Sequence, residues 1–200
     1  MAISAAQVKE LRDMTGAGLM ECKMALTEAN GDLDKAVIVL RTRGQARAAK
    51  KVGRSTQQGV IGSYIHQGAQ VGVLIEVNCE SDFVARTEEF QTLVKELAMH
   101  IAAADPVHAR RGDVSTDELN REREIYRAQF KESKKPPQVI EKIVEGKINS
   151  YYEQIVLLDQ PSIRDPKTTI GEMVNGAIAK LGENITVERF ARFKVGESQN

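Results

Sequence analysis

The chain has 200 residues, of which 42% are hydrophobic and 28% charged, and its 28 Lys and Arg residues balance its 28 Asp and Glu residues. This apolar content suffices for one sizeable core, or for a core with a small satellite domain. The zero net charge argues against a nucleic-acid-binding protein, because the neutralisation of phosphates by basic residues supplies most of the non-specific affinity for nucleic acids.

Residues 1–44 carry three amphipathic helical patterns in succession. Ser4 and Gln7 have the spacing of a capping box for the first helix. Asp32 can cap the third helix, and Gly44 lies where a left-handed C-cap would be placed. A three-helix bundle of this size is marginal alone, which favours a docking module tied to a larger body. The helices are predicted over about 4–14, 19–29 and 33–43.

The segment from Arg41 to Arg54 carries six basic residues and no acidic residue, interleaved with alanines that favour a helix. Such a run can form a basic surface for an acidic partner or for RNA. It can also be a solvated, partly helical linker, and the lack of an aromatic side chain to stack on bases favours this second interpretation. We therefore predict a basic linker over residues 45–58.

After the linker the hydrophobic period changes from helical to alternating, which is typical of strands. Residues 59–66 and 69–78 form two extended runs joined at Gln67-Gly68, a pattern that predicts a hairpin. A third extended run covers residues 185–195 and is expected to complete a small antiparallel sheet. The side chains expected on one face of that third strand are Val187, Ala191, Phe193 and Val195.

Helical patterns fill the interval between the hairpin and the last strand. Ser115 and Glu118 have the spacing of a second capping box, and Pro136-Pro137 starts a further helix. The fold class expected is therefore α+β, with a small N-terminal three-helix bundle followed by a three-stranded antiparallel sheet covered by helices. The helices are predicted over about 88–104, 116–130, 137–158 and 169–181, and the domains over 1–44 (docking), 45–58 (linker) and 59–200 (α+β core).

The hydrophobic pattern stops abruptly within the stretch from Val71 to Arg86, VGVLIEVNCESDFVAR. A strand runs up to Val77, polar turn-forming residues follow, and a new helical pattern begins only at Thr87. Phe83 lies in the predicted connector, where a large apolar side chain is either turned back into the core or presented to a partner. From the residues alone the buried position is favoured, because phenylalanine is among the residue types most often buried.

No obvious catalytic constellation appears in the sequence. Gly16-Ala17-Gly18 precedes a helix, as in phosphate-binding loops, but a helix and not a strand comes before it and no Gly-Lys-Ser/Thr follows. A tight turn between helices, able to lie flat against another surface, is therefore favoured. The histidines are scattered without metal-ligand spacing. We expect no catalytic residue, no metal site and no cofactor.

The two cysteines, Cys22 and Cys79, are too few for a disulfide framework, which favours a reducing compartment. Cys79 could be a reactive thiol, but a buried structural role is favoured. The sequence has no run of about 18 apolar residues and no secretory leader, so we predict a soluble protein that is neither exported nor embedded in a membrane.

Two segments together match the signatures of a known family. The first comprises LR at 11–12, TGAGLMECK at 15–23 and AL at 25–26, and the second is VNCESDFVAR at 77–86. They closely resemble the two signatures of translation elongation factor Ts, with Ser81 where the family usually has threonine. The similarity covers nearly the whole chain and continues through KIVEG at 142–146, LLDQP at 157–161 and IAKLGEN at 178–184.

The resemblance implies a cytoplasmic guanine-nucleotide exchange factor that acts on GDP-bound elongation factor Tu during translation elongation, without covalent chemistry. In that family the Asp-Phe pair reaches the nucleotide-binding domain of the partner, where the ring wedges between helices and the disturbance dislodges the Mg²⁺ beside GDP. The resemblance thus reverses the expectation that Phe83 is buried. The residues carried over to this contact are Ser81, Asp82, Phe83 and Val84.

The resemblance also implies a ubiquitin-associated-like N-terminal bundle that docks on the same domain of the partner. Longer members carry the core in two related copies, and this chain carries it once, so a homodimer that supplies the second copy is expected. No direct contact with nucleic acid or membrane is expected. The residues carried over to the N-terminal contact are Leu11, Arg12, Thr15, Gly16, Gly18 and Met20.

Two other classes of function remain open from the residues. As a binding module, the bundle could recognise an unrelated protein or RNA through its first loop and the basic linker. As an enzyme, the body would need a reactive cluster around Cys79, Glu80, Asp82 and His66.

Overall fold

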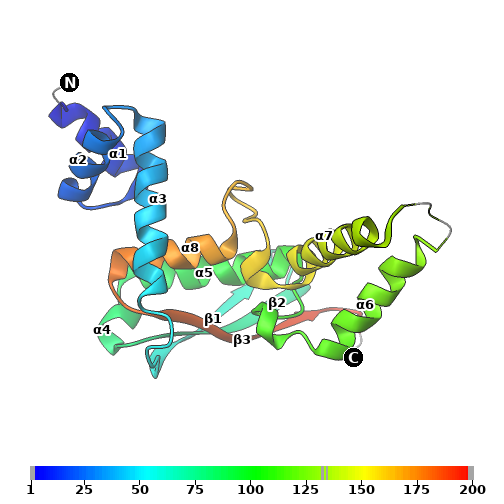
Figure 1. Cartoon of the computed structure of the whole chain (residues 1–200). Helices are drawn as coiled ribbons and strands as arrows, with labels where there is room; N and C mark the ends of the chain where they lie inside the picture. Colours follow the sequence, from blue (N-terminus) through cyan, green and yellow to red (C-terminus); the bar gives the residue numbers. More distant parts are fainter. Residues whose placement is uncertain (1–2, 132, 134, 198–200) are drawn as a thin grey trace. The chain divides into compact units, whose positions relative to one another are not determined.

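The computed structural model describes residues 3–131, 133 and 135–197. The fold is α+β, as predicted: a three-helix bundle precedes a three-stranded antiparallel sheet covered by helices (Figure 1). The bundle consists of α1 (Ala5–Thr15), α2 (Leu19–Glu28) and α3 (Leu33–Ala49). The later elements are β1 (Gln58–Ile65), β2 (Val71–Cys79), α4 (Asp82–Ala85), α5 (Glu88–Ala104), η1 (Arg111–Asp113), α6 (Thr116–Ala128), α7 (Pro137–Ile155), η2 (Leu157–Asp159), α8 (Ile170–Leu181) and β3 (Ile185–Lys194).

The described residues group into two compact units. The first contains Met1–Val60, Asn78–Leu93 and Met173–Thr186, and the second contains Ile61–Val77, Val94–Glu172 and Val187–Asn200. The strands and the helices α5 and α8 therefore contribute residues to both units. The division into segments 1–44, 45–58 and 59–200 stays a prediction.

The capping box predicted at the start of the chain is confirmed. The Ser4 hydroxyl accepts a hydrogen bond from the Gln7 amide, and the Gln7 side chain accepts one from the Ser4 amide at 3.1 Å. At the other end of α1, Gly16 adopts a left-handed conformation with φ of 67°, which turns the chain into the second helix. The core of the bundle consists of Val8, Leu11, Cys22, Ala25, Leu26, Ala29, Ala36 and Leu40.

The third helix is longer than predicted. Gly44 does not end it, because α3 continues to Ala49 with Gly44 buried in its interior. A Cβ atom at Gly44 would lie 3.5 Å from the Cβ of Ala179 in α8, an ordinary van der Waals distance, so Gly44 packs against α8 at a position where alanine would also fit. The buried residues of α3 recur every four positions, at Ala36, Leu40, Gly44 and Ala48, which is a helix-packing pattern.

The predicted hairpin is confirmed, and β2 is the central strand of the sheet. Val73, Ile75 and Val77 alternate along β2 and are buried, so they share one face of the sheet. Gly62 in β1 lies directly under α5, because a Cβ atom there would come within 2.3 Å of the Val94 side chain. The helix can approach the sheet this closely only because Gly62 has no side chain.

The face predicted for β3 is wrong over its second half. Val187 is buried, but Phe193 and Val195 are exposed. Arg192 instead turns toward α5, where its guanidinium donates to the Ala102 carbonyl and lies 3.3 Å from Asp105. These polar contacts draw Arg192 to the helix side and leave its apolar neighbours on the open side of the sheet.

The second predicted capping box is only half formed. The Ser115 hydroxyl accepts from the Glu118 amide, which caps α6, but the Glu118 side chain does not bond back. It accepts a hydrogen bond from the Tyr151 hydroxyl at 2.8 Å and lies 3.3 Å from His108. The partial burial of the phenol and, after it, the hydrogen bond to Glu118 raise the pKa of Tyr151 to about 12. Glu118 therefore joins α6 to α7.

His100 on α5 is buried against Gln160. The Gln160 amide nitrogen donates to the Gln154 carbonyl at 2.7 Å, so the Gln160 oxygen faces His100 Nε2 and accepts its hydrogen at 2.9 Å. The other ring nitrogen, Nδ1, is buried without a hydrogen-bond partner. Burial lowers the pKa of His100, because protonation would place a charged donor where no acceptor reaches it.

We predict that His100 makes the protein less stable in mild acid. In the unfolded chain this histidine titrates near its ordinary pKa of about 6.5 and in the folded chain at a lower pH, so unfolding takes up a proton as the pH falls below about 6.5. The free energy of unfolding should fall by up to about 1.4 kcal/mol per pH unit in that range. Urea titrations of the parent and of His100→Gln between pH 7 and 5 measure this loss, which the variant should largely abolish.

The exposed His66 supplies the matched control. His66→Gln should retain the pH dependence of the parent. An equal loss in the parent and in His100→Gln would contradict the role of His100.

Candidate functional site

The predicted connector after β2 contains a one-turn helix, α4, which begins at Asp82. Ser81 is its N-cap, and the Ser81 hydroxyl accepts from the Val84 amide at 3.4 Å. The Ser81 amide and hydroxyl both donate to the carboxylate of Glu183, at 2.9 and 2.6 Å. The connector between β2 and α5 therefore contains one turn of helix, which the sequence analysis did not predict.

Phe83 projects from α4 with 82% of its surface exposed. Burial, which the residues alone favoured, is wrong for this side chain, and the exposure agrees with what the family resemblance implies. Ala85 on the same turn is buried, and Ser81, Asp82 and Val84 are partly buried. The helix thus packs one side against the protein and leaves the ring of Phe83 in solvent.

The C-terminal end of α4 is held by three side chains. The Gln91 amide donates to the Ala85 carbonyl at 2.7 Å, and the Thr87 hydroxyl donates to the Val84 carbonyl at 2.8 Å. Arg86 pairs with Asp82 one turn earlier at 2.9 Å. This ion pair is exposed and contributes little energy, so the two hydrogen bonds to backbone carbonyls are the firmer restraint.

The residues predicted for N-terminal docking lie at the turn between α1 and α2. The Thr15 hydroxyl donates to the Leu11 carbonyl at 2.7 Å and accepts from the Ala17 amide at 3.4 Å, which fixes the turn. Gly16, Gly18, Met20 and Arg12 are exposed. Leu11 is completely buried in the bundle core and has no surface to offer a partner in this conformation.

The structure adds two exposed apolar side chains that the sequence analysis did not select. Met14 and Leu19 flank the turn and are 60% and 52% exposed, and Met20 beside them is 68% exposed. Methionine adapts its shape to different partners, and clustered exposed apolar side chains indicate an interaction surface. No signal in the sequence indicated their exposure, because each lies three residues from a core residue of its helix, Met14 from Leu11 and Leu19 from Cys22.

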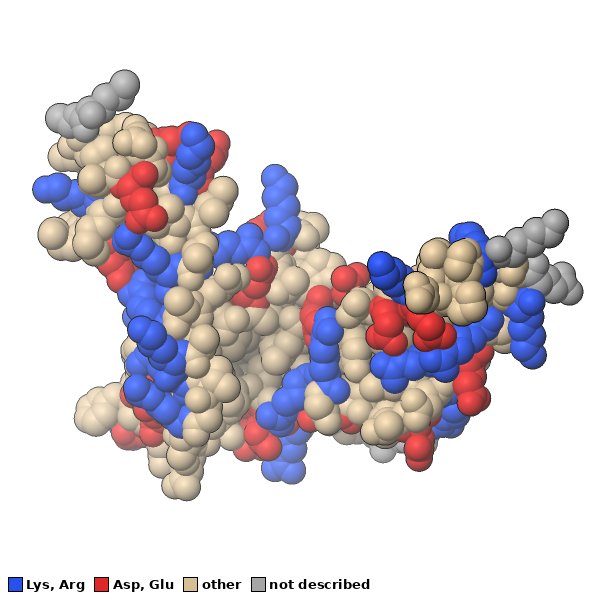
Figure 2. Space-filling model, in the orientation of Figure 1, with Lys and Arg blue, Asp and Glu red and all other residues tan. Residues whose placement is uncertain are grey.

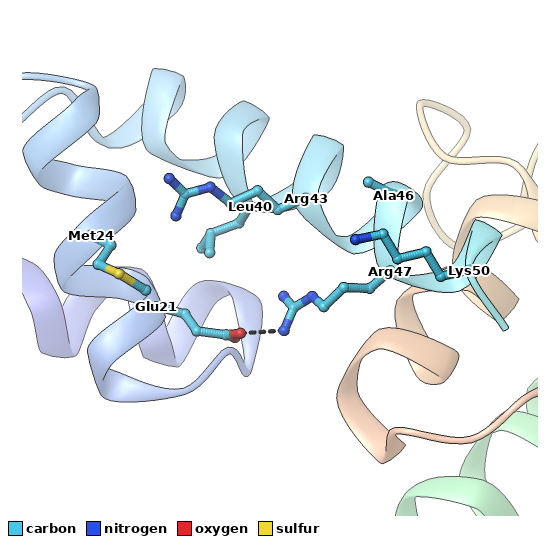
Figure 3. A pocket seen from close by; sticks show the side chains of 7 residues that line it. All are labelled: Glu21, Met24, Leu40, Arg43, Ala46, Arg47 and Lys50. Carbon is cyan, nitrogen blue, oxygen red and sulfur yellow. Dashed lines mark hydrogen bonds and ion pairs between the residues drawn. The ribbon is translucent and has the colours of Figure 1, made fainter.

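A groove of about 320 Å³ lies between α2 and α3 (Figure 3). The side chains of Met24 and Leu40 form its apolar part, and Arg47 forms an ion pair with Glu21 across it. The remaining lining residues are Arg43, Ala46 and Lys50.

The basic side chains along α3 form the blue band in Figure 2. Several of them have acidic or carbonyl partners: Arg43 pairs with Glu28, Arg47 pairs with Glu21, and Lys51 donates to the Gly182 carbonyl. These pairs offset part of the positive charge. This favours the structural interpretation of the segment over a surface for RNA.

The candidate reactive cluster around Cys79 gains no support. Cys79 is buried, and its thiol donates to the Ser81 carbonyl at 3.1 Å. Burial and the nearby Glu183 carboxylate raise the pKa of the thiol, so it stays protonated and is a poor nucleophile. Within residues 3–131, 133 and 135–197, no group of three His, Cys, Asp or Glu side chains is placed to hold a metal ion.

None of the helices in the described part of the chain is long and apolar enough to cross a membrane.

These features describe an α+β protein that presents exposed apolar side chains on a short capped helix and at a turn between two helices. The family model for "Elongation factor TS" matches residues 7–197. Three relatives named elongation factor Ts, from Geobacter sulfurreducens, Koribacter versatilis and Solibacter usitatus, are 56%, 56% and 55% identical over 197 residues. These alignments cover 98% of this chain and 91%, 90% and 93% of the relatives. The chain therefore belongs to the elongation factor Ts family of translation factors.

The exposure of Phe83 leads to a prediction about stability. Phe83→Ala should change the free energy of unfolding by less than about 0.5 kcal/mol, because little packing is lost. The same substitution at Phe90, which is completely buried, should lower it by about 3–5 kcal/mol. Urea denaturation followed by circular dichroism measures both. A loss at Phe83 comparable to that at Phe90 would show that the ring packs against the protein in solution.

Proposed function

We propose that this chain is a cytoplasmic guanine-nucleotide exchange factor for elongation factor Tu that promotes GDP release without covalent chemistry or a cofactor. The observation that supports this most is the exposed ring of Phe83 on a short helix restrained at both ends. In this proposal Phe83 enters the nucleotide-binding domain of the partner with Asp82 beside it. The disturbance displaces the Mg²⁺ that holds GDP, and Ser81 and Val84 complete the contact.

The energetics of such a factor follow from linkage. If the factor weakens GDP binding, GDP weakens factor binding by the same ratio, so the two compete through a transient ternary complex. A thousandfold faster release requires about 4 kcal/mol of stabilisation of the release barrier. One buried aromatic side chain contributes about 1.5–3 kcal/mol, which falls short. A second contact must therefore share the work.

The turn between α1 and α2 is our candidate for that second contact. Arg12, Gly16, Gly18 and Met20 are exposed there, and the glycines allow a close approach of backbone to backbone. Leu11 and Thr15 would contribute indirectly: Leu11 packs in the core of the bundle, and the Thr15 hydroxyl fixes the turn. The bundle would then dock while Phe83 acts on the metal site.

We predict that Phe83→Ala slows GDP release strongly and leaves complex formation detectable. Loss of one aromatic contact should reduce the stimulated rate by about ten- to a hundredfold, and the bundle should still bind. The measurement is the release of a fluorescent GDP analogue from elongation factor Tu, with a pull-down of the complex in parallel. Ile163→Ala removes another exposed apolar side chain and is the control. Unchanged release with Phe83→Ala would contradict the proposal.

We further propose that the chain acts as a homodimer in which the second copy supplies the second core. The open face of the sheet supports this. Ile61, Ile65, Leu74 and Phe193 are about half to two thirds exposed there. Contiguous exposed apolar side chains on a sheet face are typical of an interface, and a second copy would remove them from water.

We predict that the double variant Ile61→Glu with Leu74→Glu is a monomer. Each carboxylate would be buried at the interface of a dimer, at a large cost in solvation. Sedimentation equilibrium should give twice the chain mass for the parent and the single mass for the variant. Ile125→Glu places the same charge on an exposed apolar position of α6 and should remain dimeric. A monomeric parent, or a dimeric double variant, would contradict the proposed interface.

We also propose that the chain acts without direct contact with nucleic acid or a membrane. This proposal is supported by the zero net charge and by the pairing of the α3 arginines with Glu21 and Glu28. Resemblance of the bundle to ubiquitin-associated domains also remains part of the proposal.

A further inference from the structure

Glu183 lies in the short segment between α8 and β3, 102 residues along the chain from the helix that carries Phe83. Its carboxylate is nevertheless bonded to the first residue of that site. Oε1 accepts from the Ser81 hydroxyl at 2.6 Å, and Oε2 accepts from the Ser81 amide at 2.9 Å. Bonds to a charged acceptor are about twice as strong as bonds between neutral groups.

The bond to the Ser81 hydroxyl also determines how Ser81 caps α4. A serine hydroxyl has one hydrogen to donate and two lone pairs to accept with. Because its hydrogen points to Glu183, a lone pair is left for the Val84 amide, which donates to it at 3.4 Å. A four-residue helix cannot be stable through its own backbone bonds, so it depends on such contacts at its ends.

Glu183 is itself held in place by a reciprocal contact. The next residue, Asn184, is buried, and its amide donates to the Glu80 carboxylate at 2.7 Å. The Asn184 side chain donates to the Arg54 carbonyl at 2.9 Å, and the Arg54 guanidinium lies 3.6 Å from Glu80. The segments 80–81 and 183–184 therefore each offer a carboxylate to a backbone amide of the other. This pairing leaves Glu183 little freedom to follow Ser81 if the helix shifts.

We propose that Glu183 is a positioning residue for nucleotide exchange. It holds Ser81 so that α4 presents the ring of Phe83 in one orientation, and it acts through Ser81 without touching the partner. This inference rests on the proposed exchange function. Without Glu183 the ring would spend only a fraction of the time in the competent orientation, and the maximal rate of release would fall to that fraction of its original value.

The first test uses the free chain and needs no partner. The chain contains no tryptophan, so Phe83→Trp introduces a single fluorescent reporter at an exposed position. Time-resolved anisotropy should show a larger fast component when Glu183→Ala is added. Glu89→Ala removes a nearby exposed carboxylate, which pairs with Lys180 at 3.5 Å, and should leave the anisotropy unchanged. Equal anisotropy with and without Glu183 would overturn the proposal.

The second test uses the native Phe83 and measures release of fluorescent GDP from elongation factor Tu over a range of factor concentrations. Glu183→Ala should lower the maximal rate about tenfold and change the half-saturating concentration by less than about twofold, because the N-terminal docking surface is intact. Ser81→Ala and Glu183→Ala should together slow release by less than the product of their separate effects, because both break the same bonds. An unchanged maximal rate would overturn the proposal.

Glu183→Gln keeps these tests decisive if the alanine variant fails to fold. Glutamine has nearly the same shape, but its amide can accept from only one of the two Ser81 donors. Glu183→Gln should increase the fast component of the anisotropy and lower the maximal rate of release, each by less than Glu183→Ala does. Behaviour identical to the parent in both measurements would overturn the proposal. Failure of the proposed function is a separate result, because it appears as a parent chain that does not accelerate release at all.

Discussion

The exposed ring of Phe83 can be held in place only through its backbone, because its own side chain touches little of the protein. The restraint is built from both ends of α4: Ser81 is bonded to Glu183 at the start, and Gln91 bonds the Ala85 carbonyl at the end. Ala85 adds the one buried side chain of the turn. The position of the ring is thus determined by residues that are themselves fixed in a packed structure.

Local signals in the sequence predicted most of the elements. The cap at Ser4, the cap at Asp32 and the hairpin between β1 and β2 depend on residues within a few positions of one another, and all three are confirmed. The interactions that form helix caps and hairpin turns are made between residues close together in the sequence. A single sequence therefore suffices to predict them.

The errors share a different origin, which is contact between distant segments. Gly44 has the character of a helix end, but its partner is Ala179 in another helix. Glu118 stands at the third position after Ser115, but Tyr151 and His108 compete for its carboxylate. In each case the local preference is worth about 1 kcal/mol or less, and tertiary contacts outweigh it.

The candidate site was predictable only in part, for the same reason. The residue type alone favoured burial for Phe83, and only the family resemblance reversed this expectation. Nothing near Ser81 in the sequence indicates Glu183, because that contact forms only when the chain folds. Leu11 and Met14 show the converse case, since they are three residues apart on one helix, yet one is buried in the core and the other is exposed to solvent.

In the proposed function, a division of binding energy between two modest contacts would suit a factor that must also be released. By linkage, whatever the factor gains by binding the nucleotide-free partner it must give up again when nucleotide returns. A single large apolar anchor would bind tightly whether or not nucleotide is present, and such uniform binding does not shift the equilibrium. In the proposed function, Phe83 would contribute chiefly where it disturbs the metal site of the partner, and the exposed Met20 would add affinity without demanding one fixed shape. The hydrogen bonds at both ends of α4 would position the ring, so the energy of the contact itself could remain small.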